Sequence, residues 1–195
     1  MALVMVAAST FVGVIVVAAT STRDSPSSAG ERRFEGATLP AGVEAPRFVL
    51  RDQDGERIAM DDLRGRPVIV TFLYTTCEDT CPTQAQQVRS ALNELGEDVP
   101  ALAVAVDPER DTPESARTFL AEQRVLGRMD FVLGSRAELK KVWRAFAVQP
   151  QREDLEHSGR FVLVDPKGVQ RVSFPIDQAT PDRLAHDLRL LAGGA

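Results

Sequence analysis

The chain has 195 residues, of which 44% are hydrophobic and 26% are charged, and its formal net charge is −5. This size and composition are typical of a soluble globular domain with one hydrophobic core and a short appendage. The charges form no basic stripe, which excludes nucleic acid as a partner. The two cysteines are too few for a disulfide-stabilised miniprotein, and the sequence contains no glycine-rich phosphate loop.

Residues 2–20 carry no charge and are long enough to cross a bilayer as a helix. A cleaved signal peptide is the alternative, but the apolar run is long for one and Ala18-Ala19-Thr20 is only a loose cleavage site. We therefore expect residues 1–22 to form an uncleaved N-terminal hydrophobic helix. The arginines follow this segment, so the positive-inside rule alone would place the domain in the cytoplasm. We expect the extracytoplasmic face instead, because a start codon assigned too late would remove preceding basic residues.

Residues 23–42 are rich in Ser, Gly, Ala and Pro, which predicts a flexible linker before a domain spanning residues 43–195. At the start of this domain, two short apolar runs, 48–50 and 57–58, flank Asp54-Gly55. This dipeptide is a strong signal for a hairpin turn.

Residues 68–74 are apolar apart from Thr71, which predicts a central strand buried on both faces. The polar turn that follows holds both cysteines. Residues 76–80 offer capping side chains, and Pro82 fits the first turn of a helix. Cys77 and Cys81 are therefore expected where a strand passes into a helix, the edge at which open α/β sheets bind ligands.

The position of the two cysteines favours reactive thiols. A helix N-terminus carries partial positive charge, which stabilises thiolate over thiol. Four residues of spacing place both sulfurs on one side of the first turn, where they could chelate one soft ion or close a disulfide. A purely structural disulfide, or two buried thiols, is the alternative at this point.

The remaining elements alternate between helices and strands. The pattern predicts a helix from 84 to 95, a strand over 101–106, a helix from Thr112-Pro113, a strand over 131–133, a helix begun by a Ser135–Glu138 capping box, strands over 161–164 and 169–172, and a last helix from Thr180-Pro181. This order predicts an α/β sandwich with a mixed sheet.

The sequence has two histidines. His186 is predicted to be solvated, because it lies on the helix face opposite Leu184 and Leu188. His157 lies in a polar, acidic loop directly before a buried strand, and no packing requirement explains it. It is therefore a candidate functional residue.

Three motifs carry a family resemblance: residues 74–82 around the cysteines, residues 106–114 with Asp107-Pro108-Glu109-Arg110-Asp111-Thr112, and Glu156-His157-Ser158 with the 165–168 turn. In this order, from about residue 43 to residue 191, the chain resembles the Sco/SenC family. Members of that family are membrane-anchored, thioredoxin-like copper chaperones that assist assembly of cytochrome c oxidase. The resemblance implies a thioredoxin-like sandwich with a mixed central sheet.

The resemblance also implies a copper site. Cys77 and Cys81 match the two thiolate ligands, His157 matches the imidazole ligand, and residues 107–112 match a loop near the metal. One copper ion per monomer, as Cu(I) or Cu(II), is expected. Glu78 stands where the family usually has Pro, so we expect altered tuning of the metal and of the thiol redox potential.

The chemistry of these residues agrees with copper. Thiolates are soft ligands that select Cu(I), whereas imidazole tolerates both oxidation states. Three protein ligands leave a position open for an acceptor, while structural zinc would need a fourth ligand.

The expected function is that of a metallochaperone rather than an enzyme. It would deliver copper to the Cys-rich binuclear site of a cytochrome c oxidase subunit. The alternative is a thiol-disulfide oxidoreductase that uses Cys77 and Cys81 as a redox pair to reduce the acceptor's cysteines. Three residues separate the cysteines where thioredoxins have two, and the 157–159 segment replaces the thioredoxin cis-proline. A third alternative, an anchored domain with a structural disulfide, leaves His157 unexplained.

Overall fold

The computed structural model describes residues 33–150 and 159–194. The predicted anchor, residues 23–32 of the predicted linker, and His157 lie outside these residues. The described strands are β1 (Ala37–Thr38), β2 (Val49–Arg51), β3 (Arg57–Ala59), β4 (Val68–Leu73), β5 (Ala101–Ala105), β6 (Asp130–Val132), β7 (Arg160–Val164) and β8 (Gln170–Pro175), and the helices are η1 (Met60–Leu63), α1 (Thr80–Leu95), α2 (Pro113–Glu122), α3 (Arg136–Ala145), η2 (Ile176–Gln178) and α4 (Pro181–Ala192).

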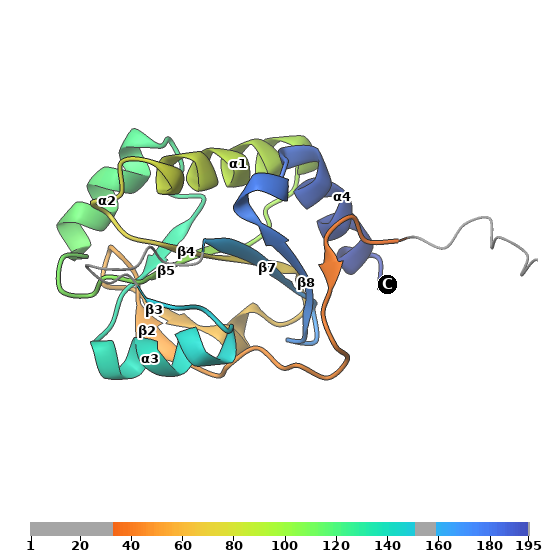
Figure 1. The fold of residues 1–195 in the computed structure, drawn as a ribbon, viewed down its shortest axis with the longest axis horizontal. Coiled ribbons are helices and arrows are strands. Elements are labelled where there is room, and N and C mark those ends of the chain that lie inside the picture. The colour runs from red at the N-terminus through yellow and green to blue at the C-terminus, as the bar shows by residue number, and fades with distance from the viewer. Residues whose placement is uncertain (1–32, 151–158, 195) are drawn as a thin grey trace, which may run out of the picture. The chain divides into compact units, whose positions relative to one another are not determined.

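Six strands form one mixed sheet in the order β1-β8-β7-β4-β5-β6. Strand β4 is central, because it pairs in parallel with β5 and antiparallel with β7. Every residue of β4, including Thr71, is buried, as the largely apolar run at residues 68–74 predicted. Figure 1 shows why: α1 and α4 cover one face of the sheet, while α3 and the β2–β3 hairpin cover the other. The predicted α/β sandwich with a mixed sheet is confirmed.

The β2–β3 hairpin forms at the predicted turn. Gly55 has a φ angle of +80°, a left-handed conformation that glycine adopts without strain. The buried Asp52 carboxylate accepts hydrogen bonds from the backbone N–H groups of Asp54 and Glu56, at 2.8 and 2.9 Å. These bonds satisfy the backbone of the turn.

The helix ends follow the sequence signals, with one exception. Thr112 and Ser115 form a capping box on α2, and the predicted capping box of Ser135 and Glu138 opens α3. At α1, by contrast, the expected side-chain cap from residues 76–80 is absent, since the N-cap residue Asp79 makes no such bond. None of the helices in the described part of the chain is long and apolar enough to span a membrane.

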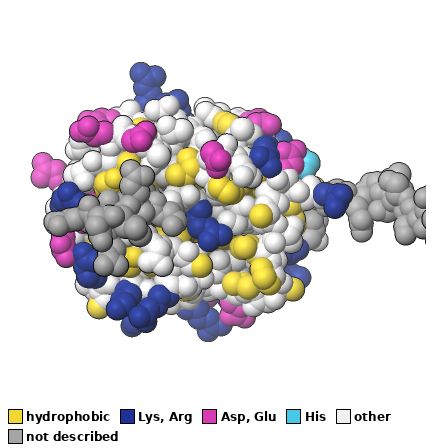
Figure 2. Space-filling view, viewed as in Figure 1, with side chains coloured by type: hydrophobic (Ala, Val, Ile, Leu, Met, Phe, Trp, Pro, Cys, Tyr) yellow, Lys and Arg dark blue, Asp and Glu magenta, His cyan; other side chains and the backbone are white. Residues whose placement is uncertain are grey.

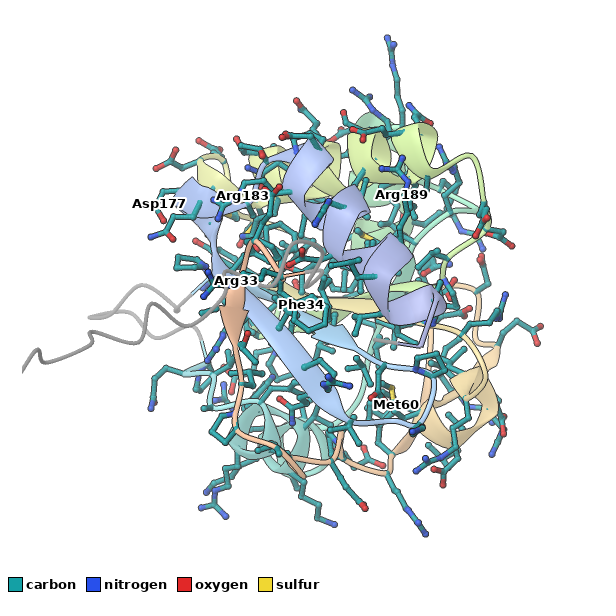
Figure 3. The ribbon with its side chains drawn as sticks, turned by 90° about the vertical axis from the view of Figure 1, so that its right-hand side faces the viewer. Arg33, Phe34, Met60, Asp177, Arg183 and Arg189 are labelled. Atoms are coloured by element: carbon teal, nitrogen blue, oxygen red, sulfur yellow. The ribbon has the colours of Figure 1, made fainter. Side chains whose placement is uncertain are left out.

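The described chain packs against the domain from its first residues, which extends the fold to the N-terminal side of the predicted start at Val43. Strand β1 pairs with β8. The buried Asp187 carboxylate of α4 accepts hydrogen bonds from the backbone N–H groups of Glu35 and Gly36, at 2.8 and 3.0 Å. A Cβ at Gly36 would lie 2.4 Å from the Val172 side chain, so only glycine fits. Figure 3 shows β1 beside β8 and α4.

Candidate metal centre

The two cysteines meet where β4 passes into α1, as predicted. Cys77 lies in the turn and Cys81 in the first turn of the helix; both are free thiols, and their exposed fractions are 7% and 0%. The Cys77 Sγ accepts a hydrogen bond from the Cys81 backbone N–H at 3.3 Å. The thiol therefore supplies the helix cap that was expected from an oxygen side chain.

The two thiols differ in acidity. Burial acts to raise the pKa of Cys77, but hydrogen bonds with Cys81, with the Asp79 backbone and with the Tyr74 side chain together bring that pKa below its ordinary value. Burial raises the pKa of Cys81, and the neighbouring Cys77 raises it further. Cys77 is therefore the more readily ionised and more nucleophilic sulfur, whereas Cys81 keeps its proton at neutral pH.

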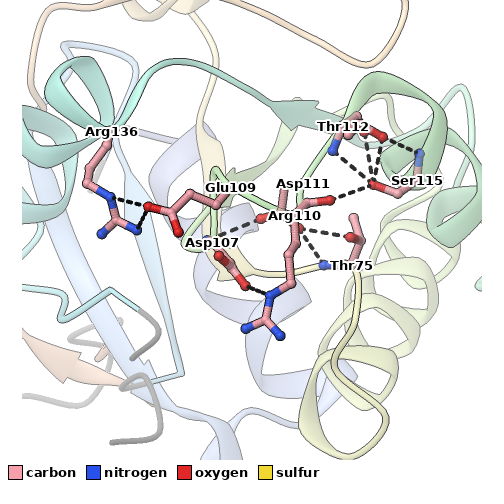
Figure 4. Close-up of polar contacts among 8 residues, drawn as sticks. All are labelled: Thr75, Asp107, Glu109, Arg110, Asp111, Thr112, Ser115 and Arg136. Carbon is pink, nitrogen blue, oxygen red and sulfur yellow. Dashed lines mark hydrogen bonds and ion pairs between the residues drawn. The ribbon is translucent and has the colours of Figure 1, made fainter. Parts of the chain in front are cut away.

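The loop after β5 holds the cysteine turn in place. Asp111 is buried, and its carboxylate accepts hydrogen bonds from the Thr75 backbone N–H at 2.7 Å and the Thr75 hydroxyl at 2.9 Å. A third bond comes from the Asp107 backbone N–H at 3.2 Å (Figure 4). Burial raises the pKa of Asp111 to about 6, although the bonds from Thr75 act in the opposite direction. Since Thr75 lies two residues before Cys77, this carboxylate fixes the start of the turn.

The same loop is also tied to α3. The Glu109 carboxylate accepts hydrogen bonds from the Arg136 guanidinium at 2.7 and 3.2 Å, while Arg110 pairs with Asp107 (Figure 4). The 107–112 loop thus joins the cysteine turn on one side to the first turn of α3 on the other. Its predicted position beside the cysteines is consistent with this contact to Thr75.

The third predicted ligand, His157, lies outside the described residues, so only the two cysteines are seen together. Among residues 33–150 and 159–194, no group of three His, Cys, Asp or Glu side chains is placed to hold a metal. His186 lies at the surface of α4, as predicted, with Nε2 3.4 Å from the Arg33 carbonyl oxygen.

A family model described as SCO1/SenC matches residues 37–193. The chain belongs to the SCO1/SenC family. It is 30% identical over 139 residues to the SCO1 protein homolog of Bacillus subtilis, an alignment covering 66% of this chain and 72% of that protein.

Solved structures of Sco proteins share the fold of this SCO1/SenC chain. Bradyrhizobium japonicum ScoI with copper bound is 30% identical, with a TM-score of 0.65 and coverage of 76% of this chain and 99% of that one. BsSco, described as having a disulfide switch and as a member of the Sco family of cytochrome c oxidase assembly proteins, is 23% identical, with a TM-score of 0.71 and coverage of 85% and 100%. The fold is the thioredoxin-like sandwich that the resemblance implied.

Two buried polar residues beneath the cysteines of this SCO1/SenC domain were not identified from sequence. Gln84, three residues after Cys81, is fully buried, and its Oε1 accepts a hydrogen bond from the Thr71 hydroxyl at 2.7 Å. Among the residues that the structure describes, its Nε2 has no hydrogen-bond partner. A Cβ at Gly159 would lie 3.2 Å from this nitrogen. This pair could have been predicted from Thr71, the single polar residue of a buried strand, because a buried hydroxyl group needs a hydrogen-bond partner.

Proposed function

We propose that this chain is a copper-binding metallochaperone that delivers copper to the binuclear copper site of cytochrome c oxidase during its assembly. The observation that carries the proposal is the pair of free, buried thiols of Cys77 and Cys81 at the start of α1 in a chain of the SCO1/SenC family. Two relatives support it, since B. japonicum ScoI has copper bound and BsSco belongs to a family of cytochrome c oxidase assembly proteins.

The copper ligands in this proposal are Cys77, Cys81 and His157. Two thiolates match the preference of Cu(I) for soft ligands, and an imidazole would tolerate Cu(II) as well. Copper is cargo here, so a three-ligand site with an open position suits transfer to an acceptor. Because the pKa of Cys81 is raised, binding copper to this thiol must release a proton, and affinity should rise with pH.

The acceptor in this proposal is an oxidase subunit with a Cys-rich binuclear copper site. Residues 2–20 would anchor the protein in the membrane, with the domain on the extracytoplasmic face. A reporter fused after Ala195 tests this topology: activity only on the extracytoplasmic side supports it, and activity only in the cytoplasm overturns it.

An anaerobic Cu(I) titration of the reduced protein, against a competing chelator, tests the ligand set. We expect one copper per wild-type monomer and none for Cys77→Ser or Cys81→Ser. His157→Ala should weaken binding by at least about tenfold, as loss of one ligand implies.

The matched control is His186→Ala, which removes the other histidine of the chain and should leave the affinity unchanged. If His157→Ala and the wild type bind Cu(I) with equal affinity, His157 is not a copper ligand and the site consists of the two thiols alone.

The second candidate, thiol-disulfide oxidoreductase, is favoured by the unequal acidity of the two thiols. A low-pKa attacking thiol beside a protonated resolving thiol is the arrangement that disulfide exchange uses. The disulfide switch described for BsSco also supports a redox-active pair. Catalytic reduction of insulin disulfides by the metal-free protein, lost in Cys77→Ser and retained in His157→Ala, would favour this function over copper delivery.

A further inference from the structure

Although the sequence shows no extended basic stripe, the fold gathers basic side chains on the outward face of α3. The helix carries Arg136, Lys140, Lys141 and Arg144, all exposed, although the whole chain has a net charge of −5. Its one acidic residue, Glu138, is engaged in the capping box with Ser135. Figure 2 shows Lys and Arg side chains gathered along the lower edge of the molecule, where α3 lies, while Asp and Glu predominate over α1 and α2.

This basic face borders a groove, which we call the α3 groove. Its volume is about 670 Å³, with Arg136, Lys140 and Arg144 as basic lining residues and Trp143, Val148 and Pro150 as apolar ones. Trp143 and Val148 are buried beneath the charged side chains, with exposed fractions of 3% and 5%. The groove therefore combines an apolar floor with a cationic rim.

Two of the rim cations have no ionic partner in the described part of the chain. Arg136 pairs with Glu109 at 2.7 Å. No ion pair joins Lys140 or Arg144 to any residue of 33–150 or 159–194. These two charges, four residues apart and on one side of the helix, remain available to anionic groups of another molecule.

We propose that the α3 groove docks an acidic polypeptide segment of a partner protein. Carboxylates of the segment would pair with Lys140 and Arg144. Four cations on a chain of negative net charge are too few for a nucleic acid backbone.

The groove adjoins the edge of the sheet that carries the cysteines. The Trp143 indole N–H donates a hydrogen bond to the carbonyl oxygen of Ala105, the last residue of β5, at 2.8 Å. Arg136, at the other end of the groove, holds the 107–112 loop through Glu109. A segment bound in the groove would thus lie against the elements that position the cysteine turn. The identification of this partner as the copper acceptor rests on the proposed function. The binding of an acidic segment in the α3 groove does not depend on it.

The test uses the metal-free, reduced full chain and a hexaglutamate peptide with blocked ends as probe. Trp143 is the only tryptophan of the chain and lines the groove, so its fluorescence reports binding directly. We expect saturable binding that weakens with salt, and no binding of hexaglutamine. Lys140→Glu with Arg144→Glu should weaken binding by roughly tenfold or more, because it reverses both unpaired charges.

The matched control is Arg66→Glu with Arg128→Glu. It makes the same change in net charge at two exposed positions near the amino ends of β4 and β6, and it should bind hexaglutamate like the wild type. Should the α3 double variant fail to fold, Lys140→Gln with Arg144→Gln takes its place with the same expected direction.

Equal weakening by the α3 and control variants would overturn the proposal, since binding would then depend on net charge alone. Binding of anionic phosphatidylserine vesicles, but not of the peptide, would assign the face to a membrane and also overturn it. If peptide binds only after Glu153, Asp154 and Glu156 are neutralised, the chain's own acidic segment excludes a partner, and the proposal fails. Because no arm contains copper, these outcomes are independent of the copper titration.

Discussion

The carboxylate of Asp111 accepts two hydrogen bonds from a single residue, Thr75: one from its backbone N–H at 2.7 Å and one from its hydroxyl at 2.9 Å. Thr75 follows β4 and Asp111 follows β5, so the contact ties together the carboxyl ends of two adjacent parallel strands. The turn that holds Cys77 starts from this tie. The buried Asp111 carboxylate thus holds the start of the turn that carries Cys77.

Replacing Asp111 by Ala should both destabilise the fold and disturb the cysteine turn. The change leaves the N–H groups of Thr75 and Asp107 without an acceptor in a buried place, a cost of about 2–3 kcal/mol in the free energy of unfolding. Urea denaturation measures this cost, and the Cu(I) titration measures the effect on the thiols, where we expect weaker binding.

Asp111→Asn is the control for this change. Its amide oxygen still accepts from Thr75, so it should lose less stability and less copper affinity than Asp111→Ala. Equal copper affinities for Asp111→Ala and wild type would show that the turn keeps its geometry without the carboxylate.

The raised pKa of Asp111 predicts a specific pH dependence of stability. The pKa of this carboxyl is about 6 in the folded state against 3.8 for the free group, so the folded state binds the proton more tightly than the unfolded state. Its contribution to stability is therefore fully present below about pH 4 and is lost as the pH rises through about 6. The size of the effect is on the order of 3 kcal/mol.

Asp111→Asn removes this titration while keeping the shape of the side chain. The difference in unfolding free energy between wild type and the variant should therefore fall by that amount from about pH 4 to about pH 7. A difference that stays constant across this range would mean that the carboxyl ionises with an ordinary pKa.

Sequence patterns were sufficient for most of the fold, because the apolar runs and caps act locally. The run at residues 68–74 predicted the buried strand β4, which ends at Leu73, and Ser135 with Glu138 predicted the start of α3. The hydrogen bonds that Asp187 accepts from Glu35 and Gly36 were not predictable, since they join residues about 150 positions apart in the chain. The composition of residues 23–42 predicted a flexible linker, but residues 35–38 of this segment are bound to α4 and β8.

In the candidate site, too, the sequence predicted what depends on local pattern and missed what depends on tertiary contacts. Both cysteines were placed correctly by the strand-to-helix pattern. The role of the Cys77 sulfur as the helix cap was not, because cap preferences rank oxygen side chains first. Likewise, the pairing of Thr71 with Gln84 requires knowing which helix covers β4.

The two thiols of the reduced, metal-free protein should differ in reactivity. Because the pKa of Cys77 is lowered and that of Cys81 is raised, iodoacetamide near neutral pH should alkylate Cys77 first. Peptide mass mapping of briefly treated protein measures the order. Cys81→Ser should be modified at Cys77, whereas Cys77→Ser should react slowly until denatured. Alkylation of both thiols at the same rate would contradict the assigned acidity.

One added methyl group at Gly159 should lower the stability of the fold. A Cβ there would lie 2.0 Å from Ile176 Cδ1 and 3.2 Å from Gln84 Nε2, so Gly159→Ala forces the Ile176 side chain to move. Because the clashing Cδ1 is the end of a flexible, half-buried side chain, we expect a loss of only about 1 kcal/mol in unfolding free energy. Thermal denaturation measures it.

A double-mutant cycle identifies the cause of this loss. Ile176→Ala removes the clashing atoms, so Gly159→Ala should cost much less in that background. If the cost were the same in both backgrounds, the clash with Ile176 would not be its source.

The buried Asp187 carboxylate should strengthen the attachment of residues 35–38 to the domain. Asp187→Ala leaves the N–H groups of Glu35 and Gly36 without their acceptor. The pairing of β1 with β8 and the ion pair between Arg183 and Glu35 remain. We expect the free energy of unfolding to fall by about 2–3 kcal/mol. Amide hydrogen exchange of residues 35–38 should accelerate more than exchange in β4, because β1 opens locally before the core unfolds.

Asp182→Ala, at an exposed position on the same helix, is the control and should leave exchange in β1 unchanged. If exchange in β1 and β4 rose in parallel, the carboxylate would support the whole fold rather than the attachment of the N-terminal strand.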